Sequence, residues 1–596
     1  NYFICIKIDR EERPDIDQVY MDACQLINSN GGWPLNAFAL PDGSPVHAGT
    51  YFPKQQWQTL LLNIADMWKN EPSKALEYSK QLSDGIKNMS KAGEVLNEKI
   101  AFNFNKIFAD LSLNFDSVYG GQNRAPKFPL PNYYEFLLDH YLLNNKKEAL
   151  DFTIFTLEHI ALGGLYDQLA GGFARYSVDA RWFAPHFEKM LYDNAQLISL
   201  YSRAFAITKD KLFLRISEDT IDFCRRNLRH ENGLYYSALD ADTEGEEGKY
   251  YVWQYQEVQE LLGIDSDIFC KYFQIVPEGS WEHGNSILYS IDRIEKAAVS
   301  FDMPLSDLEL LLERSKVKLL AVREKREKPG LDDKALCSWN GLMLKALADA
   351  AMATGNKSYL QEAEELSDLI LKSFFQDNKL LRTWKNGHSK INGFIEDYAT
   401  VIQGLIALYK AGYNEKYLLK AKELTEIAVE NYFDNDNNLF HFNSKSEPVL
   451  VARKYDVGDD VISSANSIMA ENLMWLGYLF ADSQWIGMAE KMVELMQVNI
   501  SQFPAWHSQW ARVAQIMQKG VFQIEAVGKN VNESLNNFNP LLHPGIILTI
   551  KNSEDNQIPI LKDKIISSEN EFYVCRNMVC DKPVKTLKEA IGATVN

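Results

Sequence analysis

The sequence has few cysteines, few histidines and no long apolar run. Among its 596 residues there are 7 cysteines and 10 histidines. No run of about 18 consecutive apolar residues occurs, so we expect no membrane-spanning helix. The cysteines lie mostly singly in apolar surroundings, which is typical of reduced core residues. The expected localisation is therefore cytoplasmic.

Cys575 and Cys580 form the one close cysteine pair in the C-terminal part of the sequence. Their spacing permits half of a zinc site, but no second pair of ligands lies nearby. Packing at the end of a strand is the favoured interpretation, and we expect no metal. No glycine-rich phosphate loop follows a predicted strand in this part, so we expect no nucleotide or other cofactor either.

Basic residues are also in deficit. The sequence has 62 Lys and Arg against 81 Asp and Glu, which gives a formal charge of −19. Nucleic-acid and anionic membrane surfaces need clustered Lys and Arg, so neither partner is expected. The sequence begins at Asn1 and enters an apolar run at once, from which we expect that upstream residues are missing.

Residues 1–95 alternate strand and helix patterns. The run YFICIKID predicts a buried strand over 2–9, and an amphipathic helix is expected over 15–27. The segment GGWPLNAFALPDG predicts a further strand that ends at a Pro-Asp-Gly turn. Pro34 precedes that strand, and a proline at this position can be cis, a form that is seldom accidental.

Residues 96–520 are mainly helical and repeat loosely. Long apolar helices end in hairpins at 229–237, 377–384 and 434–442, and polar helix starts recur at 186–197, 332–347, 395–405 and 463–473. The spacing is wider than that of a tetratricopeptide unit and is irregular. Alternating inner and outer helices that close on themselves explain it better. Inner helices should then be apolar around their whole girth, because both faces are buried.

Residues 521–596 read as a small α/β piece. The runs FQIEAVG, GIILTIKN and EFYVCRN predict strands, and NESLNNF and KTLKEAIG predict helices.

Several of these motifs carry a family resemblance. IKIDREERPDIDQVYM, GGWPLNAFALPDG and HAGTYFP resemble the thioredoxin-like domain of the spermatogenesis-associated thioredoxin-like family, and APKFPLP, LYYSALDADTEGEEGKYYVW, DDKALCSWNGLM and NSIMAENL are similar to later parts of it. In that family a Cys-x-x-Cys stretch precedes the first strand. This sequence contains none, so thiol–disulfide chemistry has no support.

The resemblance implies a multi-domain, mainly α fold. It implies a partial thioredoxin-like α/β module over 1–95 and an (α/α) six-hairpin toroid over 96–520. A small α/β C-terminal piece over 521–596 completes it. This toroid is the architecture of many glycosidases and of the N-acylglucosamine and cellobiose 2-epimerases.

The most informative stretch runs from 171 to 197. Pro185 suits the first turn of a helix, and His186, Lys189 and Asp193 would then share one face at i, i+3, i+7 spacing. We favour one wall of a ligand pocket. The alternative is a capped helix with a buried salt-bridge network.

In a toroid of this type, loops at the starts of the inner helices form a funnel, and the polar motifs gather there. Carboxylates, amides and aromatic faces suit sugars, although each aromatic could equally be core. Asp240 and Asp242 alternate on a strand-like segment and should both face the funnel. The catalytic candidates are Asp193, Asp242, Asp333, Glu396 and His186. The substrate-binding candidates are Arg175, Tyr176, Asp179, Trp182, Glu188, Lys189, Asp240, Glu244, Trp253, Trp339, Asn340, Asp397 and Asn466.

Two reaction classes fit this set. Glycoside hydrolysis needs a pair of carboxyl groups, here Asp193 or Asp333 with Asp242 or Glu396. Sugar epimerisation needs bases with pKa values near neutrality, and the shortage of histidines beyond His186 counts against it. The third hypothesis is a non-catalytic binding or redox-adaptor protein that meets a protein partner through its thioredoxin-like module.

Overall fold

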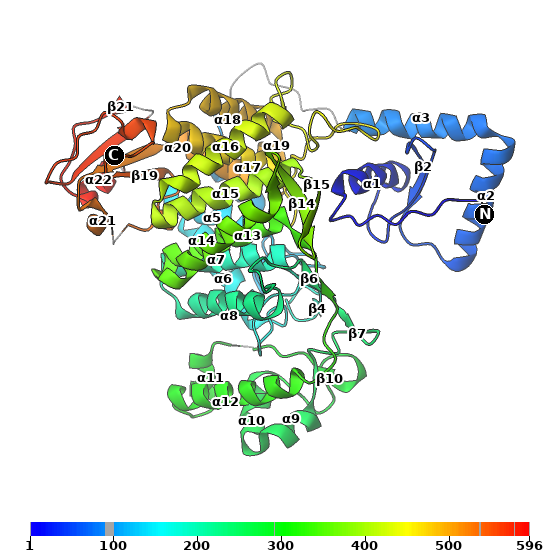
Figure 1. Ribbon diagram of the computed structural model, residues 1–596. Coiled ribbons are helices and arrows are strands. Elements are labelled where there is room, and N and C mark those ends of the chain that lie inside the picture. The colour runs from blue at the N-terminus through cyan, green and yellow to red at the C-terminus, as the bar shows by residue number, and fades with distance from the viewer. Residues whose placement is uncertain (1, 90–100, 291, 536–537, 577–578, 595–596) are drawn as a thin grey trace.

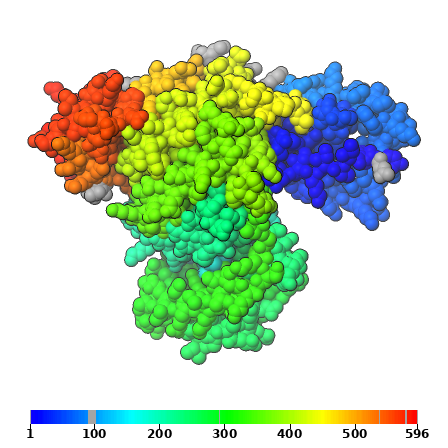
Figure 2. Space-filling view, viewed as in Figure 1, coloured from blue at the N-terminus to red at the C-terminus, as the bar shows by residue number. Residues whose placement is uncertain are grey.

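The computed structural model describes residues 2–89, 101–290, 292–535, 538–576 and 579–594. A central body of helices carries an N-terminal module at one end and a C-terminal α/β domain at the other, with a helical insertion on one side (Figures 1 and 2). No helix in these ranges is both long and apolar enough to cross a membrane. The predicted boundary at residue 95 lies outside the described residues, and the boundary at 520 falls between α20 and β18.

Six inner helices form a closed ring. Each packs against the next, and the last packs back against the first. Most of their residues are buried, because each helix meets two neighbours in the ring and an outer layer behind. In ring order they are α5 (Pro131–Asn144), α7 (Leu191–Thr208), α13 (Cys337–Thr354), α15 (Ile395–Gly412), α17 (Ala465–Phe480) and α20 (Ser508–Lys519).

Outer helices pack behind this ring. Five of them follow an inner helix directly and pack against it: α6 (Lys147–Leu162), α8 (Lys211–Asn227), α14 (Lys357–Phe374), α16 (Glu415–Tyr432) and α18 (Ser483–Leu495). The short α4 (Phe104–Ser112) takes the sixth place, where Phe108 stacks on His140 of α5 at 5.6 Å. The predicted (α/α) six-hairpin toroid is therefore confirmed.

Short hairpins precede the inner helices. The predicted hairpin at 229–237 closes through an Arg229–Tyr235 bridge. The one at 377–384 is β13 (Phe375–Gln376) with β14 (Lys379–Lys385), which also pairs with β12 (Ala335–Leu336) and β15 (His388–Asn392). The one at 434–442 is β16 (Phe433–Asp434) with β17 (Leu439–Phe440). All three predicted hairpins are confirmed.

One helix start was predicted too early. Residues Pro185–His186 form β4, which pairs with β3 (Tyr176–Ser177), and Lys189–Met190 form β5, which pairs with β6 (Ala238–Leu239). The helix begins only at Leu191, so the prediction that His186, Lys189 and Asp193 share one helix face is wrong. Pairing with neighbouring strands outweighed the local helix signal of Pro185.

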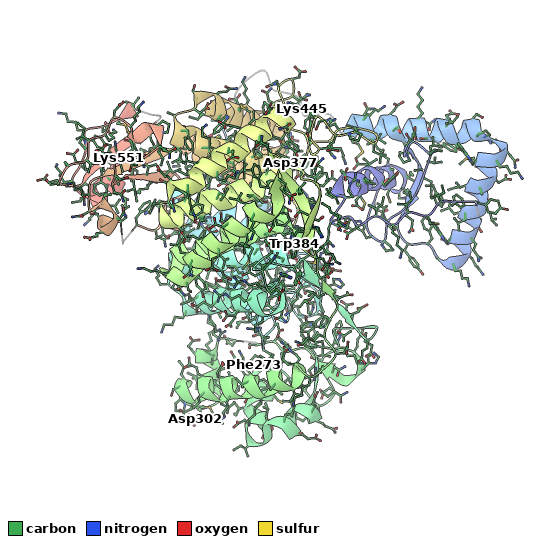
Figure 3. All side chains as sticks on the ribbon, in the orientation of Figure 1. Phe273, Asp302, Asp377, Trp384, Lys445 and Lys551 are labelled. Carbon is green, nitrogen blue, oxygen red and sulfur yellow. A yellow bond between two sulfur atoms is a disulfide. The ribbon has the colours of Figure 1, made fainter. Side chains whose placement is uncertain are left out.

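The insertion has its own hydrophobic core. Its helices are α9 (Tyr255–Leu262), α10 (Ser266–Tyr272), α11 (Ile294–Ser300) and α12 (Leu305–Arg323), and Phe273 is one of its core residues (Figure 3). Short strands lead into it: β7 (Asp242–Thr243), β8 (Glu246–Glu247), β9 (Trp253–Gln254) and β10 (Asn285–Ser286), while β11 (Leu331–Asp332) pairs with β6 on the way back to the toroid.

The N-terminal module contains α1 (Pro14–Asn28), β1 (Asn36–Ala39), β2 (Pro45–Gly49), α2 (Lys54–Asn70) and α3 (Pro72–Met89). The Trp33–Pro34 peptide is cis. The predicted buried strand over 2–9 is wrong. Within the described module only β1 and β2 pair, so this run has no strand to join, and Ile4 is 92% exposed.

The C-terminal domain is a four-stranded sheet in the order β19 (Ile546–Lys551), β18 (Phe522–Val527), β20 (Glu571–Arg576) and β21 (Val579–Cys580), with α21 (Val531–Ser534) and α22 (Leu587–Ala593). The predicted strands are confirmed. Cys575 and Cys580 face each other across β20 and β21 and form a disulfide, which corrects the expectation of unbonded packing at a strand end.

Candidate functional site

Each inner helix carries a polar stripe on the face that looks into the ring. Residues three, four or seven apart share a helix face, so Gln196, Ser199 and Arg203 lie along one line of α7. The other stripes supply Asn132, Glu135 and Asp139 on α5, Lys345 and Asp349 on α13, Gln403 and Lys410 on α15, Glu471 and Trp475 on α17, and Gln509 and Arg512 on α20. The prediction that these helices are apolar all round is therefore wrong.

These stripes enclose two connected chambers on the barrel axis. The upper chamber lies toward the helix N-termini and has a volume of about 480 Å³. The lower chamber lies toward the C-termini and has a volume of about 660 Å³. Both are lined by Glu135, Lys345, Gln403 and Arg512, which form the boundary layer between them.

Segments from outside the ring close both ends. We call residues 460–463 the lid: Asn132 donates to the Asp460 carbonyl at 3.1 Å, and Gln196 donates to the Val461 carbonyl at 2.9 Å. Residues 540–544 of the C-terminal domain line the lower chamber, and we call them the floor. Arg203 holds the floor by donating from Nε to the Leu541 carbonyl at 3.4 Å.

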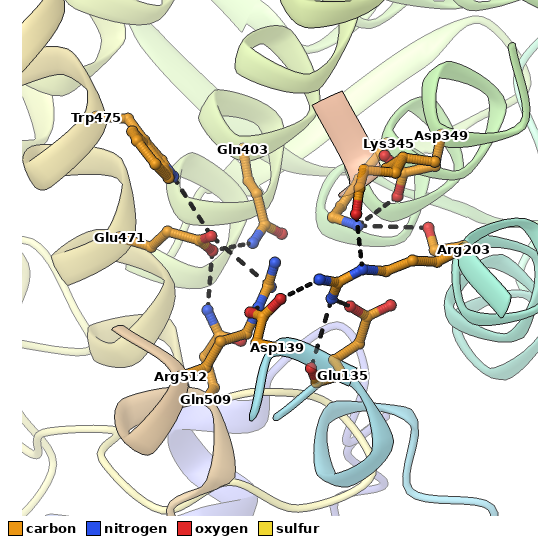
Figure 4. A network of polar contacts seen from close by, with 12 residues as sticks. Glu135, Asp139, Arg203, Lys345, Asp349, Gln403, Glu471, Trp475, Gln509 and Arg512 are labelled. Carbon is orange, nitrogen blue, oxygen red and sulfur yellow. Dashed lines mark hydrogen bonds and ion pairs between the residues drawn. The ribbon is translucent and has the colours of Figure 1, made fainter. Parts of the chain in front are cut away.

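Two arginines hold the carboxylates of α5. Arg203 donates to Glu135 and to Asp139, and Arg512 donates from Nε to the other oxygen of Asp139 at 2.5 Å (Figure 4). Burial alone would raise the pKa of Glu135, but Arg203 and Arg512 outweigh it and lower that pKa to about 2. These groups therefore stay charged and pair with one another.

Glu471 is a second anchor of the network. Its Oε2 accepts hydrogen bonds from Gln403 at 2.9 Å and from Gln509 at 2.8 Å, and its Oε1 accepts one from Trp475 at 3.5 Å (Figure 4). Burial acts to raise the pKa of Glu471, but Arg512 and Lys410 outweigh it, so the pKa is lowered. The carboxylate is therefore anionic, and its hydrogen bonds orient the side-chain amides of Gln403 and Gln509 beside the chambers.

Lys410 differs from the other charged residues of the axis. Lys345 pairs with Asp349 at 2.5 Å, whereas Lys410 makes no hydrogen bond or ion pair with the part of the chain that the structure describes. Its Nζ lies 4.1 Å from the centre of the Trp475 ring. Burial lowers the pKa of Lys410 to about 8, although Glu471 opposes the shift.

Three predicted residues stand at the entrance of the same stripes. Asp193, Trp339 and Glu396 lie in the first turns of α7, α13 and α15, nearest the N-terminal module. Oδ2 of Asp193 is buried without a hydrogen-bond partner, and burial raises the pKa of this carboxyl well above its ordinary value, against the opposing charge of Arg175. Arg175 itself pairs with Glu188 at 3.0 Å.

Other predicted residues lie elsewhere on the surface. Asp240 and Asp242 are exposed and line neither chamber, so they do not face the axis as predicted. Glu244 pairs with Lys249 at 3.2 Å on the same exposed hairpin. Asp333 pairs at the surface with Lys385 at 2.5 Å.

His186 and Tyr176 form a partly exposed pair outside the chambers. The two rings stack with centroids 5.1 Å apart. Nδ1 of His186 lies 2.7 Å from a carboxylate oxygen of Glu247, which holds the imidazole in place.

A third group of predicted residues has structural contacts. Trp182 is fully buried and donates to the Tyr119 carbonyl at 2.9 Å. Trp253 is fully buried in the insertion, under the guanidinium of Arg326 at 3.9 Å. Asp179 accepts from the backbone N–H groups of residues 181 and 184. Lys189 is buried and pairs with Asp167.

The two predicted asparagines clamp hairpins to helix starts. Asn340 accepts from the Tyr235 N–H at 2.9 Å and donates to the carbonyls of Tyr235 and Leu336. Asn466 exchanges the same pair of bonds with Phe440. Asp397 plays a related part by accepting from Phe394 N–H at 2.8 Å and from Ser338 N–H at 2.9 Å. These contacts fix the mouth of the barrel.

The axial residues are not among the predicted site residues, because the prediction rests on polar motifs at the starts of the inner helices. The signal was present as polar pairs spaced by four or seven inside otherwise apolar helices, such as Glu135 with Asp139, Lys345 with Asp349, and Gln403 with Lys410.

Sequence comparisons identify a matching family for the N-terminal module and relatives that match nearly the whole chain. A family named Thioredox_DsbH, described as "Protein of unknown function, DUF255", matches residues 1–87. Spermatogenesis-associated protein 20 of Homo sapiens is 30% identical over 642 aligned positions, which cover 98% of this chain and 82% of the human protein. An uncharacterized protein of Caenorhabditis elegans is 30% identical over 98% of this chain and 87% of its own length.

Solved structures that resemble the chain include a D-mannose isomerase, at TM-score 0.44 and 14% identity over 66% of this chain and 84% of that one. A cellobiose 2-epimerase from Bacillus thermoamylovorans gives a TM-score of 0.43 and 10% identity over 66% of this chain and 87% of that one. An α-mannanase of Bacteroides thetaiotaomicron gives 0.42 and 12% over 70% and 94%. No reaction is inferred from likenesses at this level.

Proposed function

The chain belongs to the family of spermatogenesis-associated protein 20, and from its axial chambers we propose that the helical barrel binds a carbohydrate between lid and floor. The observation that carries the proposal is the polar lining, to which all six inner helices contribute.

The chemistry of the lining suits a neutral ligand rich in hydroxyl groups. Four basic side chains face four acidic ones, so the axis has no excess charge to attract an ion: Arg203, Lys345, Lys410 and Arg512 against Glu135, Asp139, Asp349 and Glu471. Amides that already hold Glu471 can donate and accept further bonds.

One buried acceptor in the lower chamber lacks a donor. Oδ1 of Asn472 has no hydrogen-bond partner, and a buried polar atom of this kind calls for a ligand or a water. The indole of Trp475 supplies an aromatic face in the same chamber. A sugar can donate a hydroxyl to Oδ1 of Asn472 and can pack its C–H groups on the Trp475 indole.

For turnover, the acid/base pair that we propose is Asp193 with Glu396 at the entrance. A carboxyl group whose pKa is raised by burial is protonated near neutral pH and can act as a general acid. Glu396, in the first turn of α15, pairs with Arg382. The carboxylates of the axis are held by arginines, amides or Lys345, and are less suited to proton transfer.

A thermal-shift screen against neutral mono- and disaccharides tests the proposal. A ligand at about 100 times its Kd should stabilise the protein by about 2.7 kcal/mol. Gln403→Met removes a donor to Glu471 and should abolish the shift, while Asp242→Asn, on the exposed hairpin, should preserve it. Flat curves for the parent protein across the panel, or a shift that survives in Gln403→Met, would contradict binding in the chambers.

A further inference from the structure

Lys410 is the one axial cation that the network leaves unpaired among the described residues. Arg203, Arg512 and Lys345 each have a carboxylate partner. Lys410 has none, although Glu471 and Asp349 lie near enough to influence it. An ammonium group that is removed from water normally takes such a partner, because an unpaired buried charge is costly.

The surroundings of Lys410 are those of a nucleophilic amine. Its Nζ stands over the Trp475 ring, and Ile406, Ala407 and Met352 line the same chamber. Arg512 and Lys345 add positive charge, and together with burial they lower the pKa of Lys410 to about 8, against the opposing Glu471 and Asp349. With this pKa, roughly a tenth of the side chain is the neutral amine at pH 7 and about a quarter at pH 7.5.

Neutral lysine side chains attack carbonyl carbons. Enzymes that use a lysine in this way lower its pKa by desolvation or by a neighbouring cation, and both influences act on Lys410. The floor lines the lower chamber around the amine, so a small carbonyl compound that enters the chamber could meet the amine there.

We propose that Lys410 condenses with the aldehyde carbon of an open-chain reducing sugar in the lower chamber and forms an imine. This inference rests on the carbohydrate function proposed above. The amine nitrogen bonds to the carbonyl carbon, the carbonyl oxygen leaves as water with the two amine hydrogens, and a C=N bond remains. No electrons are transferred. Water reverses the step, so the adduct is a reversible covalent intermediate.

Reductive trapping tests the proposal on the full chain. D-glyceraldehyde is the probe, because it is an aldose with a free aldehyde and too small to depend on ring fit. Borohydride delivers hydride to the imine carbon and leaves a stable secondary amine, which peptide mass spectrometry locates. Glycerol, which lacks the carbonyl, is the matched control ligand.

Labelling at Lys410 should exceed that at the exposed Lys416 by at least about tenfold at pH 7.5, because Lys410 lies in the chamber with its pKa lowered to about 8, whereas Lys416 lies on the surface near Asp368. Lys410→Gln should lose this label and keep the label at Lys416, and its unfolding transition shows whether it is folded. Equal labelling at the two lysines in the parent protein would overturn the imine.

The same experiment separates the two proposals. A sugar that stabilises the parent protein and protects Lys410 from glyceraldehyde supports both. Stabilisation by sugars without preferential labelling of Lys410 overturns the imine and leaves the binding function standing. Preferential labelling with no stabilisation by any sugar supports a carbonyl-reactive Lys410 and contradicts the carbohydrate function.

Discussion

Two lysines in this protein have the same lowered pKa and opposite surroundings. Burial lowers the pKa of both Lys189 and Lys410 to about 8. Lys189 donates to Asp167 at 2.9 Å and to the Gly171 carbonyl at 3.3 Å, and Arg323 holds the other Asp167 oxygen at 2.9 Å. The Lys410 side chain makes no hydrogen bond or ion pair with a described residue, and its Nζ lies over the Trp475 ring.

The comparison shows that a shifted pKa does not by itself identify a reactive group. Asp167 is a brace: it joins Lys189 on the toroid strand β5 to Arg323 at the end of the insertion helix α12. Burial acts to raise the pKa of Asp167, but Arg323 and Lys189 outweigh it and hold it well below its ordinary value. Lys410 has no such carboxylate partner among the described residues, so its amine is available to react with a ligand.

The strongest test of the brace is Asp167→Asn. This change leaves Lys189 and Arg323 buried without their common anion, and we expect a loss of about 3–5 kcal/mol in the free energy of unfolding. Thermal or urea unfolding measures it. Asp242→Asn, on the exposed hairpin, is the control and should stay within about 0.5 kcal/mol of the parent. A loss in Asp167→Asn no larger than in this control would remove the distinction between brace and reactive site.

A matched pair of lysine replacements sharpens the contrast. Lys189→Met should cost about 2 kcal/mol, because Asp167 loses a charged donor. Lys410→Met should not destabilise the protein, since no ion pair or hydrogen bond of the side chain is broken and a charge that burial disfavours is removed. Both are read from the same unfolding curves. Similar losses in the two variants would show that Lys410 contributes to the fold as much as Lys189 does.

A smaller effect is expected from Asn340→Ala. The loss of three hydrogen bonds to the backbone should lower the free energy of unfolding by about 1–2 kcal/mol. A bound sugar should still raise the unfolding temperature as much as it does in the parent protein. Gln403→Met should differ in the ligand shift, which should be lost, although this variant too should cost about 1–2 kcal/mol because Glu471 loses one amide donor. If Asn340→Ala abolished the ligand shift while the protein stayed folded, its sequence-based assignment to substrate binding would regain support.

A further contrast lies in the pH dependence of stability. The folded pKa of Lys410, about 8, lies below its ordinary value of 10.5, so the unfolded chain binds more protons between these values. The parent should therefore gain stability relative to Lys410→Met as the pH rises from 8 to 10. Below pH 8 the difference should be constant. Unfolding midpoints at pH 7, 8, 9 and 10 measure it, and a flat difference would place the amine in water.

The ring architecture and the C-terminal strands could be predicted from the sequence, because long apolar helices, turn-rich hairpins and alternating strands are local signals. The start of α7 could not, since β4 and β5 depend on partners far along the chain, Tyr176 and Ala238 among them. The run at 2–9 has a strand pattern, but a strand also needs a neighbour.

The candidate site divides in the same way. Asp193, Trp339 and Glu396 stand at helix starts, where polar residues are conspicuous in the sequence, and their part in binding stays a prediction. Which polar residues meet on the axis depends on how six helices are rotated about their own axes, and that is decided by packing. Asn340 shows the converse, because its spacing suggested a ligand and its bonds go to backbone.

The floor of the lower chamber belongs to a different domain from its walls. Residues 540–544 belong to the connection between β18 and β19 of the C-terminal domain. The walls of the chamber are formed by the six inner helices. The depth and the chemistry of the bottom are thus set by a short segment that packs on α7 and α13 but is not part of the ring. Substitutions, insertions or deletions in this segment can therefore change the size and the chemistry of the chamber while the six inner helices stay the same.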